Sequence, residues 1–266
     1  MQRFEKGKYL GVNKRQQAYG DIFLSNTCYN KELQSDWHYH ENPFFSFLFS
    51  GGSVENRKSE CIECIPGQIY FYNWHEPHKN TNYQENTQNF NIELDAHWLK
   101  TLDINETAIT GSFSIQSPDI KFTIVKLFKE FLRSDDLSGA SINLLTLELL
   151  QQLCRTSITR HRPVWVNQLK EILHDHWSEN LSLHHLASLL NIHHVTISKY
   201  FSRYFDCTLG EYVRKIRVEK ALGLVRSTSL SLSAIAYECG FADQSHFIRT
   251  FKDQTGFRPN EFRKLE

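Results

Sequence analysis

The chain has 266 residues, of which 40% are hydrophobic and 13% aromatic, so it holds enough apolar material for one large or two ordinary domains and is not a disordered chain. Its 30 basic and 30 acidic side chains give a formal net charge of zero, which by itself gives no indication of a nucleic-acid partner. No apolar run reaches the roughly 18 residues of a membrane-spanning helix, and the N-terminal segment is polar. We therefore expect no transmembrane helix, no signal peptide and a cytoplasmic location.

The two parts of the chain differ in charge. Residues 1–159 carry 15 basic and 19 acidic side chains, whereas residues 160–266 carry 15 basic, 11 acidic and eight of the 13 histidines. The first part is modestly acidic and the second modestly basic, which indicates two parts with different surfaces.

Residues 18–112 have the pattern of short β-strands. Segments such as FFSFLF (44–49) and GQIYFYNW (67–74) are rich in aromatic and β-branched residues. Turn-forming stretches such as ENP, SGG and NWHEPHKN separate these segments. Several short strands separated by regularly spaced turns predict a β-sandwich or a β-barrel.

Two helices are predicted after these strands. IKFTIVKLFKEFL (120–132) places apolar side chains at helical spacing, and RSDDLSG then interrupts the pattern. INLLTLELLQQL (142–153) carries leucines that cover more than one face of a helix. These leucines are Leu144, Leu145, Leu147, Leu149, Leu150 and Leu153. A helix this apolar packs on two sides, so the pair forms either a dimer interface or a contact within the chain.

The segment RTSITRHRP (155–163) is polar, basic and ended by proline, which indicates an interdomain linker. Everything after it has the pattern of helices and turns, with a short last helix following Pro259. The other expected helices are 164–177, 182–190, 194–205, 209–226, 231–239 and 243–254.

An internal repeat lies in this helical part. LSLHHLASLLNIHHVTISKYFSRYF (181–205) aligns with LSLSAIAYECGFADQSHFIRTFKDQ (230–254) at an offset of 49 residues, which becomes 50 after one extra turn residue. Each copy predicts a helix, a short turn and a second helix, with a small residue, Ala187 or Ala236, where the two helices cross. Small residues at a crossing allow the steep angle of a helix-turn-helix.

The second helix of each copy has an apolar face and a polar face. Ile197 and Phe201 align with Phe247 and Phe251, and we expect these four side chains and Phe205 to be buried. Short polar side chains and a cation on the opposite face suit the major groove, where Gln pairs with adenine and Arg with guanine. In a single copy such a face is equally well explained as solvated surface, but its repetition with aligned basic positions favours DNA. The predicted DNA-binding residues are Val195, Thr196, Ser198, Lys199, Arg203, Gln244, Ser245, His246 and Arg249.

The segment 165–264 resembles the DNA-binding domain of AraC/XylS-type bacterial transcription regulators. The resemblance is carried by IRVEKALGLVRSTSLSLSAIAYECGFADQSHFIRTFKDQTGFRPNEFR, which includes the second copy of the repeat. It implies two helix-turn-helix units joined by a long helix, both of which read double-stranded promoter DNA. We further expect a homodimer, and RNA polymerase as a partner if the protein is an activator.

The N-terminal part resembles, more loosely, the cupin-type sensor domain that often precedes this module. DWHYHENPFFSFLFSGG and GQIYFYNWHEPHKNTN are similar to the two cupin motifs. The resemblance implies a small-molecule effector bound in this domain. The candidate effector-binding residues are His38, His40, Phe45, Phe47, Tyr70, Tyr72, Trp74 and His78.

Metal-binding cupins hold their ion with two histidines, a glutamate and a third histidine. The three histidines are matched by His38, His40 and His78, whereas Phe44 stands at the glutamate position. We therefore expect no cofactor and no metal, although three imidazoles suit a first-row metal. If a metal binds, these three histidines are its expected ligands.

The expected fold class is α+β with two domains: an N-terminal cupin-like β-barrel with a helical dimerisation segment, and a C-terminal all-α double helix-turn-helix domain. Residues 1–155 form the cupin-like sensor and dimerisation domain, whose helical part is 118–155. A linker, 156–164, precedes the DNA-binding domain, 165–266.

The predicted function is a sequence-specific DNA-binding transcription regulator, not an enzyme, controlled by an effector or by association through the N-terminal part. The alternative is a metal-dependent cupin enzyme with a helical appendage, which needs a full ligand set and an open coordination position. A third hypothesis is a protein-interaction module. No P-loop, GxSxG or HExxH motif supports any other enzyme.

Overall fold

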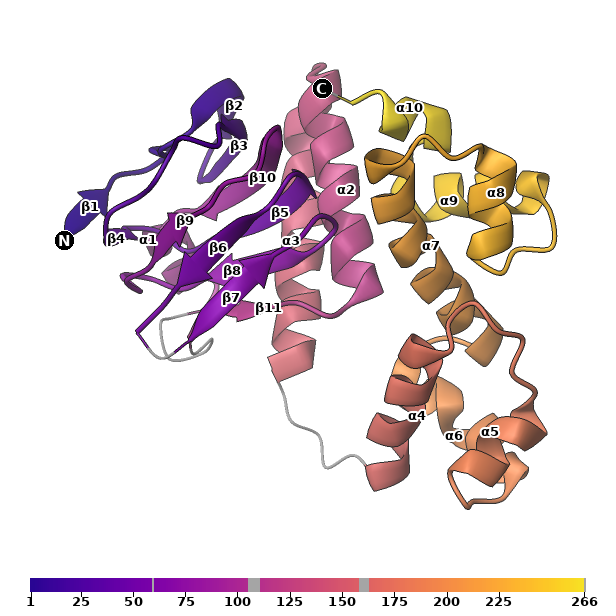
Figure 1. Cartoon of the computed structure of the whole chain (residues 1–266). Coiled ribbons are helices and arrows are strands. Elements are labelled where there is room, and N and C mark those ends of the chain that lie inside the picture. Colours follow the sequence, from indigo (N-terminus) through magenta and orange to yellow (C-terminus); the bar gives the residue numbers. More distant parts are fainter. Residues whose placement is uncertain (59, 105–110, 158–162, 266) are drawn as a thin grey trace. The chain divides into compact units, whose positions relative to one another are not determined.

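The computed structural model describes residues 1–58, 60–104, 111–157 and 163–265 (Figure 1). The chain divides into two compact units, Met1–Ser157 and Ile158–Glu266. The first unit contains β-sheets and helices and the second only helices, which confirms the predicted α+β class. Most of the predicted linker, 156–164, lies outside the described residues. Within the described part of the chain, no helix combines the length and the apolar content that crossing a membrane requires.

The strands of the N-terminal unit pair into three sheets. The largest has the antiparallel order β11-β8-β5-β10-β3-β2, a second has the antiparallel order β7-β6-β9, and the third pairs β1 with β4 in parallel. The strands are β1 (Gln2–Phe4), β2 (Val12–Tyr19), β3 (Ile22–Tyr29), β4 (His38–His40), β5 (Phe44–Ser50), β6 (Ser53–Asn56), β7 (Cys61–Cys64), β8 (Ile69–Tyr72), β9 (Lys79–Thr81), β10 (Thr87–Leu94) and β11 (Phe113–Ser114). A short helix, α1 (Ala96–Thr101), follows β10 and is capped by Asp95.

Strand β5 lies inside the six-stranded sheet and is apolar on both faces. Successive strand residues point to opposite faces, so Phe44 and Leu48 lie on one face and Phe49 on the other. The ring centroids of Phe49 and Phe90 lie 4.4 and 4.9 Å from that of Phe128 on helix α2 (Pro118–Arg133). Helix α2 therefore covers one face of the sheet, while the opposite face borders the space shared with the three-stranded sheet.

The predicted helix after the strands is confirmed by α2, which begins at the position that the sequence indicates. The Ser117 hydroxyl accepts a hydrogen bond from the Ile120 N–H, and Pro118 occupies the first turn, where its missing N–H costs nothing. The helix ends at Ser134, whose φ of 49° lies in the left-handed region. The apolar stripe of α2 is buried at Ile120, Ile124, Leu127, Phe128 and Phe131.

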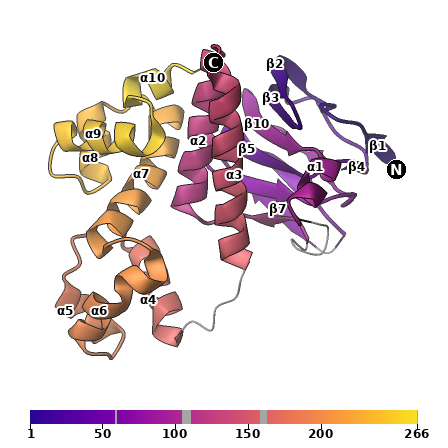
Figure 2. The same ribbon diagram turned by 180° about the vertical axis from the view of Figure 1, so that it is seen from behind.

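Helix α3 (Ser138–Ser157) runs beside α2 in both views (Figures 1 and 2). It buries Leu149, Leu150 and Leu153. Two other leucines on the same helix, Leu144 and Leu147, remain 69% and 43% exposed. The leucines thus lie on two faces of the helix. Within the described part of the N-terminal unit, only one of these faces is packed against other residues.

The C-terminal unit consists of seven helices in its described part, at positions within about two residues of those predicted. They are α4 (Val164–Asp175), α5 (Leu183–Leu189), α6 (His194–Phe205), α7 (Leu209–Ser227), α8 (Leu232–Glu238), α9 (Gln244–Thr255) and α10 (Pro259–Arg263). The repeat appears as two helix pairs, α5–α6 and α8–α9, with α7 between them (Figure 1). Ile197, Phe201, Phe247 and Phe251 are buried, as expected, whereas Phe205 is only partly buried against the same core.

Candidate nucleic-acid interface and ligand space

Helices α6 and α9, the second helices of the two pairs, both start at a side-chain cap. The His193 imidazole accepts a hydrogen bond from the Val195 N–H at 3.3 Å, and the Asp243 carboxylate accepts one from the His246 N–H at 2.8 Å. A cap fixes the residue at which each helix begins, and therefore which side chains project from its first turn.

The structure places the predicted DNA-binding residues on the outer faces of α6 and α9. Thr196 and His246 are half-buried, and the other predicted residues are exposed. The exposed ones are Val195, Ser198, Lys199, Arg203, Gln244, Ser245 and Arg249. Helix α6 thus buries Phe201 and helix α9 buries Phe247 and Phe251, while most of the polar side chains of both helices face solvent.

The cations on these two faces are not neutralised by any acidic side chain among the described residues. Among the described residues, Lys199, Arg203 and Arg249 form no ion pair with an acidic side chain. The Lys199 ammonium lies 5.3 Å from the Tyr200 ring centroid, and the Arg203 guanidinium lies 5.9 Å from that of Tyr204. Unpaired cations on an outward helix face are available to phosphates or to base edges.

Two of the predicted residues also make contacts inside the unit. The Gln244 side-chain oxygen accepts a hydrogen bond from the Ser233 hydroxyl, which ties α9 to α8. The His246 ring stands edge-on to Phe241, with 5.4 Å between their centroids. His246 also borders a hollow of about 350 Å³, which lies beside Trp177. The contacts of Gln244 with Ser233 and of His246 with Phe241 hold the first turn of α9 in place.

Three further imidazoles lie near the start of α6 and had no assigned role in the sequence analysis. The ring of His194 lies 4.3 Å from that of His184 and 4.4 Å from that of His193. Local desolvation and the two neighbouring imidazoles lower the pKa of His194. The signal available in the sequence was the pair of HH dipeptides, 184–185 and 193–194.

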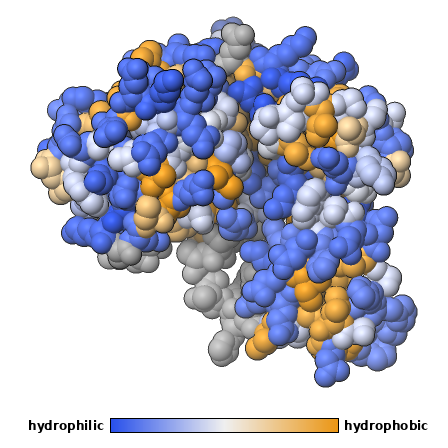
Figure 3. Space-filling model, viewed as in Figure 1, coloured by the Kyte–Doolittle hydropathy of each residue, from blue (hydrophilic) through white to orange (hydrophobic). Residues whose placement is uncertain are grey.

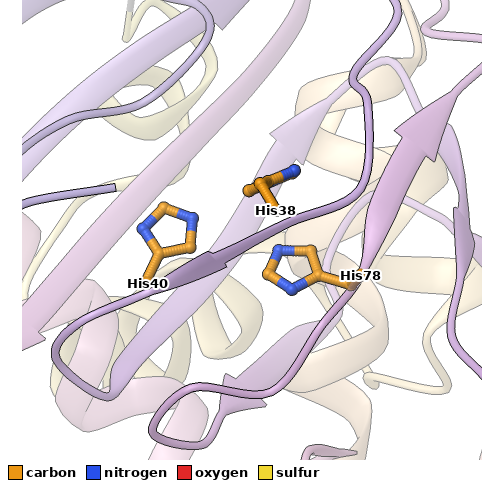
Figure 4. A group of neighbouring side chains, drawn as sticks. All are labelled: His38, His40 and His78. Carbon is orange, nitrogen blue, oxygen red and sulfur yellow. The ribbon is translucent and has the colours of Figure 1, made fainter. Parts of the chain in front are cut away.

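In the N-terminal unit, the three predicted histidines come together between the sheets (Figure 4). Their relative exposures are 4% for His38, 5% for His40 and 4% for His78. His38 and His78 exchange backbone hydrogen bonds of 3.0 and 2.9 Å, so strand pairing fixes their separation. One ring nitrogen of each of the three lies within 4.8 Å of the others.

The surroundings keep these imidazoles neutral. Burial and the neighbouring His78 lower the pKa of His38 to about 4, and burial also lowers the pKa of His40 and of His78. Nδ1 of His38 and Nδ1 of His78 donate to the backbone carbonyls of Asp36 and Glu76 at 2.8 and 3.1 Å. Their Nε2 lone pairs are therefore free, as a metal ligand requires. Nδ1 of His40 is buried without a hydrogen-bond partner.

The space beside the histidines is small. Its volume is about 40 Å³, which holds about one water molecule or an ion. Pockets for organic ligands usually measure roughly 300–1,000 Å³. Of the predicted effector-binding residues, those that line this space are His38, His40, Tyr70, Tyr72 and His78.

The remaining predicted residues, Phe45, Phe47 and Trp74, are buried but do not line this space. Phe45 and Phe47 alternate with Phe44 along β5 and therefore lie on its other face. The sequence FFSFLF is apolar at almost every position, so its inward and outward residues could not be separated beforehand.

A carboxylate near the histidines was missed by the sequence analysis. Glu55 on β6 is fully buried, and its carboxylate accepts hydrogen bonds from the Arg57 guanidinium, at 2.6 Å, and from the Tyr72 hydroxyl. Its charge raises the pKa of His78 and of His38, against the larger effect of burial. Because the Glu55 carboxylate already accepts hydrogen bonds from Arg57 and Tyr72, it is not free to bind a metal. The three histidines therefore fit a three-nitrogen metal site better than the four-ligand site of a metal-binding cupin.

Comparison with known proteins relates the chain to bacterial regulators. A family model described as "Helix-turn-helix domain" matches residues 186–265. The "HTH-type transcriptional activator RhaS" of Enterobacter sp. (strain 638) is 31% identical over 175 residues, which cover 65% of this chain and 60% of that protein. The "Msm operon regulatory protein" of Streptococcus mutans is 27% identical over 265 residues, which cover 97% of this chain and 81% of that protein. This chain thus covers less than two thirds of the RhaS activator.

Among solved structures, the chain is similar to the C-terminal domain of AraT, a response regulator from Geobacillus stearothermophilus. The two are 30% identical, and the match covers 39% of this chain and 87% of that domain with a TM-score of 0.37.

Proposed function

We propose that this chain, a two-domain protein of the AraC/XylS type, is a sequence-specific DNA-binding regulator of bacterial transcription. The family match over residues 186–265 includes both α6 and α9. The relatives bear the names of a transcriptional activator and of an operon regulatory protein. These names favour a regulator over the alternative of a metal-dependent enzyme. A protein that reads bacterial promoters acts in the cytoplasm, which is the location we propose.

The observation that carries this proposal is the pair of exposed helix faces with unpaired cations. Lys199 on α6 and Arg249 on α9 occupy equivalent positions in the repeat, and both are exposed. Phosphate contacts would place the two helices, and the polar side chains between the cations would read base edges. Helix α7, with 19 residues, is about 28 Å long, which suits recognition helices placed in successive major grooves roughly 34 Å apart.

The test is selection of bound genomic fragments with the purified full-length chain, followed by mobility-shift titrations on the selected DNA. We expect a small set of promoter fragments, bound with an affinity that falls steeply as salt rises, because phosphate contacts release counterions. Uniform binding to all fragments would contradict sequence-specific recognition, and no binding to any fragment would favour a protein-interaction module.

We propose that the protein acts as a homodimer through the outer face of α3. Exposed or half-exposed residues recur there at alternating spacings of three and four, as in the seam of a coiled coil. They are Leu137, just before the helix, followed by Ala140, Leu144, Leu147, Gln151 and Cys154. A second copy that packs on this seam would cover the exposed leucines and bring a second pair of recognition helices to the DNA. If the protein activates transcription, RNA polymerase is its further partner.

The proposed effector binds in the N-terminal unit, and the space beside the histidines favours one ligand class. An organic molecule requires the packed aromatic side chains to move apart, because the space measures only about 40 Å³. A single transition-metal ion fits three neutral imidazoles that lie within 4.8 Å of one another. The sensing of such an ion is therefore a second candidate role for this unit, in place of an organic effector.

Metal titration separates these two ligand classes. Metal-free protein is titrated with Zn²⁺ by calorimetry and with Co²⁺ by visible absorption, and DNA affinity is measured with and without each ion. A metal sensor binds one ion per chain, and His78→Gln abolishes binding while the exposed His97→Gln does not. Absence of binding, together with a metabolite that shifts DNA affinity, would support an organic effector.

A further inference from the structure

The Arg217 side chain, on α7, connects the two helix-turn-helix units of the C-terminal domain. Its Nε donates to the Trp177 carbonyl at 3.1 Å, and its Nη2 donates to the Glu179 carbonyl at 3.0 Å and to the Asn180 side-chain oxygen at 2.9 Å. These acceptors lie in the loop between α4 and α5. Its Nη1 donates at 2.6 Å to the carbonyl of Gly240, in the turn between α8 and α9.

The backbone approaches closely at the same place. Gly240 has a φ of 70°, and a Cβ atom added to it would lie 2.5 Å from the Ser178 carbonyl oxygen and 2.9 Å from Arg217 Cζ. Both distances are too short for a side chain. The turn of the second unit therefore lies against the α4–α5 loop of the first, and the guanidinium occupies the junction.

The chemistry of this contact requires a guanidinium. Its acceptors are three backbone carbonyls and one amide oxygen, all of them neutral, and the Arg217 residue is only 9% exposed. A planar fork with five donors reaches carbonyls in two directions at once, whereas a lysine ammonium is a compact charge with three donors. A cation that served only as a solvated surface charge would not be held by these four acceptors.

We propose that Arg217 is a positioning residue that fixes the distance and the angle between the recognition helices α6 and α9. The α5–α6 pair packs on α7 through a core that includes Ile216, and the α8–α9 pair packs on α7 as well. Without the guanidinium, α7 and its packing contacts alone would set the relative angle of the pairs. Arg217 adds hydrogen bonds between the two pairs, so that α6 and α9 are held at one fixed distance and angle when they meet DNA. This role rests on the proposed function, because the spacing matters only if both helices read the same DNA.

The first test measures geometry without DNA. Spin-labelled non-canonical amino acids are placed at Ser202 on α6 and Asp253 on α9 of the full-length chain, both of them exposed. The distance distribution between the labels is then measured by pulsed electron paramagnetic resonance. We expect a narrow distribution in the parent protein and in Lys220→Met, which removes the same charge from an exposed site on α7. Arg217→Lys and Arg217→Met broaden it, while circular dichroism shows the helices intact. An unchanged distribution in both Arg217 variants would overturn the proposal.

The second test measures spacing on selected DNA. One base pair is inserted or removed between the sequences that α6 and α9 contact, which moves one site about 3.4 Å along the duplex and turns it by about 35°. The parent protein loses about tenfold or more in affinity per shift, comparable to the loss of one specific contact. The Arg217 variants bind the natural spacing less tightly but discriminate less between spacings, to within about threefold. Variants that keep the parent's discrimination would refute the role of Arg217. A parent that binds no DNA would defeat the proposed function, while the label distances would still decide whether Arg217 sets the geometry.

Discussion

Asn191 and Gly240 occupy equivalent positions in the two helix-turn-helix units, and both have left-handed backbone, with φ of 50° and 70°. Each follows the first helix of its pair. The next residue in each unit donates its N–H to the carbonyl of Ala187 or Ala236, at 3.0 and 2.9 Å. The same local motif therefore ends both first helices and sets the angle at which the second helix of each pair begins.

These two turns should respond differently to substitution. Asn tolerates the left-handed region, so we expect Asn191→Gly to change the free energy of unfolding by less than about 1 kcal/mol. Gly240→Ala adds both left-handed strain and a clash with the Ser178 carbonyl, so it should lower that free energy by about 2 kcal/mol or more. Urea denaturation followed by helical circular dichroism measures both. Equal effects of the two substitutions would contradict a close contact at Gly240.

Removal of one exposed cation from each recognition helix should weaken DNA binding. Lys199→Ala and Arg249→Ala should each cost about 1–3 kcal/mol of binding free energy if the side chain pairs with a base. If the side chain contacts only phosphate, the affinity should fall for all sequences alike. The slope of log affinity against log salt concentration should then become shallower by about one. Mobility shifts at several salt concentrations distinguish the two cases. Lys14→Ala, an exposed cation of the N-terminal unit, is the matched control, and equal affinities for all three variants would refute both contacts.

A charge in the outer face of α3 should break the proposed dimer. Leu144 is 69% exposed, so Leu144→Glu costs little in the folding of one chain. In a coiled-coil seam the buried carboxylate opposes association, and the dissociation constant should rise at least tenfold. Analytical ultracentrifugation measures this change. Asn143→Glu adds the same charge next to the seam and should leave the dimer intact, while an unaltered dimer in Leu144→Glu would place the interface elsewhere.

Stability should fall at mildly acidic pH because of the buried histidines. The pKa of His38 is about 4 in the folded chain and about 6.5 when unfolded, so between these values the unfolded state binds more protons. The free energy of unfolding should therefore be constant above about pH 6.5 and should decrease by about 1.4 kcal/mol per pH unit from there to about pH 4. The pKa of His40 and of His78 is also lowered, which steepens the decrease.

Denaturation at pH 7.5 and 5.0 in the presence of a chelator measures this slope. His40→Phe removes one titrating imidazole from an aromatic environment and should flatten the slope, whereas the exposed His97→Phe should leave it unchanged. A slope that is the same in all three proteins would mean that other groups dominate the titration.

The helices of the C-terminal unit and the outward faces of α6 and α9 could be predicted from the sequence alone. These features are local: apolar residues recur every three or four positions, and a capping side chain lies within three residues of the amide that it binds. Because the pattern occurs twice, the alignment of Lys199 with Arg249 also follows from the sequence.

Contacts between residues far apart in the chain could be recognised only from the folded structure. His38 and His78 are 40 positions apart and become neighbours only through strand pairing. Phe45 was a candidate for the ligand space, but its strand is apolar on both faces. Only the packing of α2 shows which face is covered by a helix and which borders the ligand space. The contacts of Arg217 had no signal in the sequence, because three of its four acceptors are backbone carbonyls, which every residue carries.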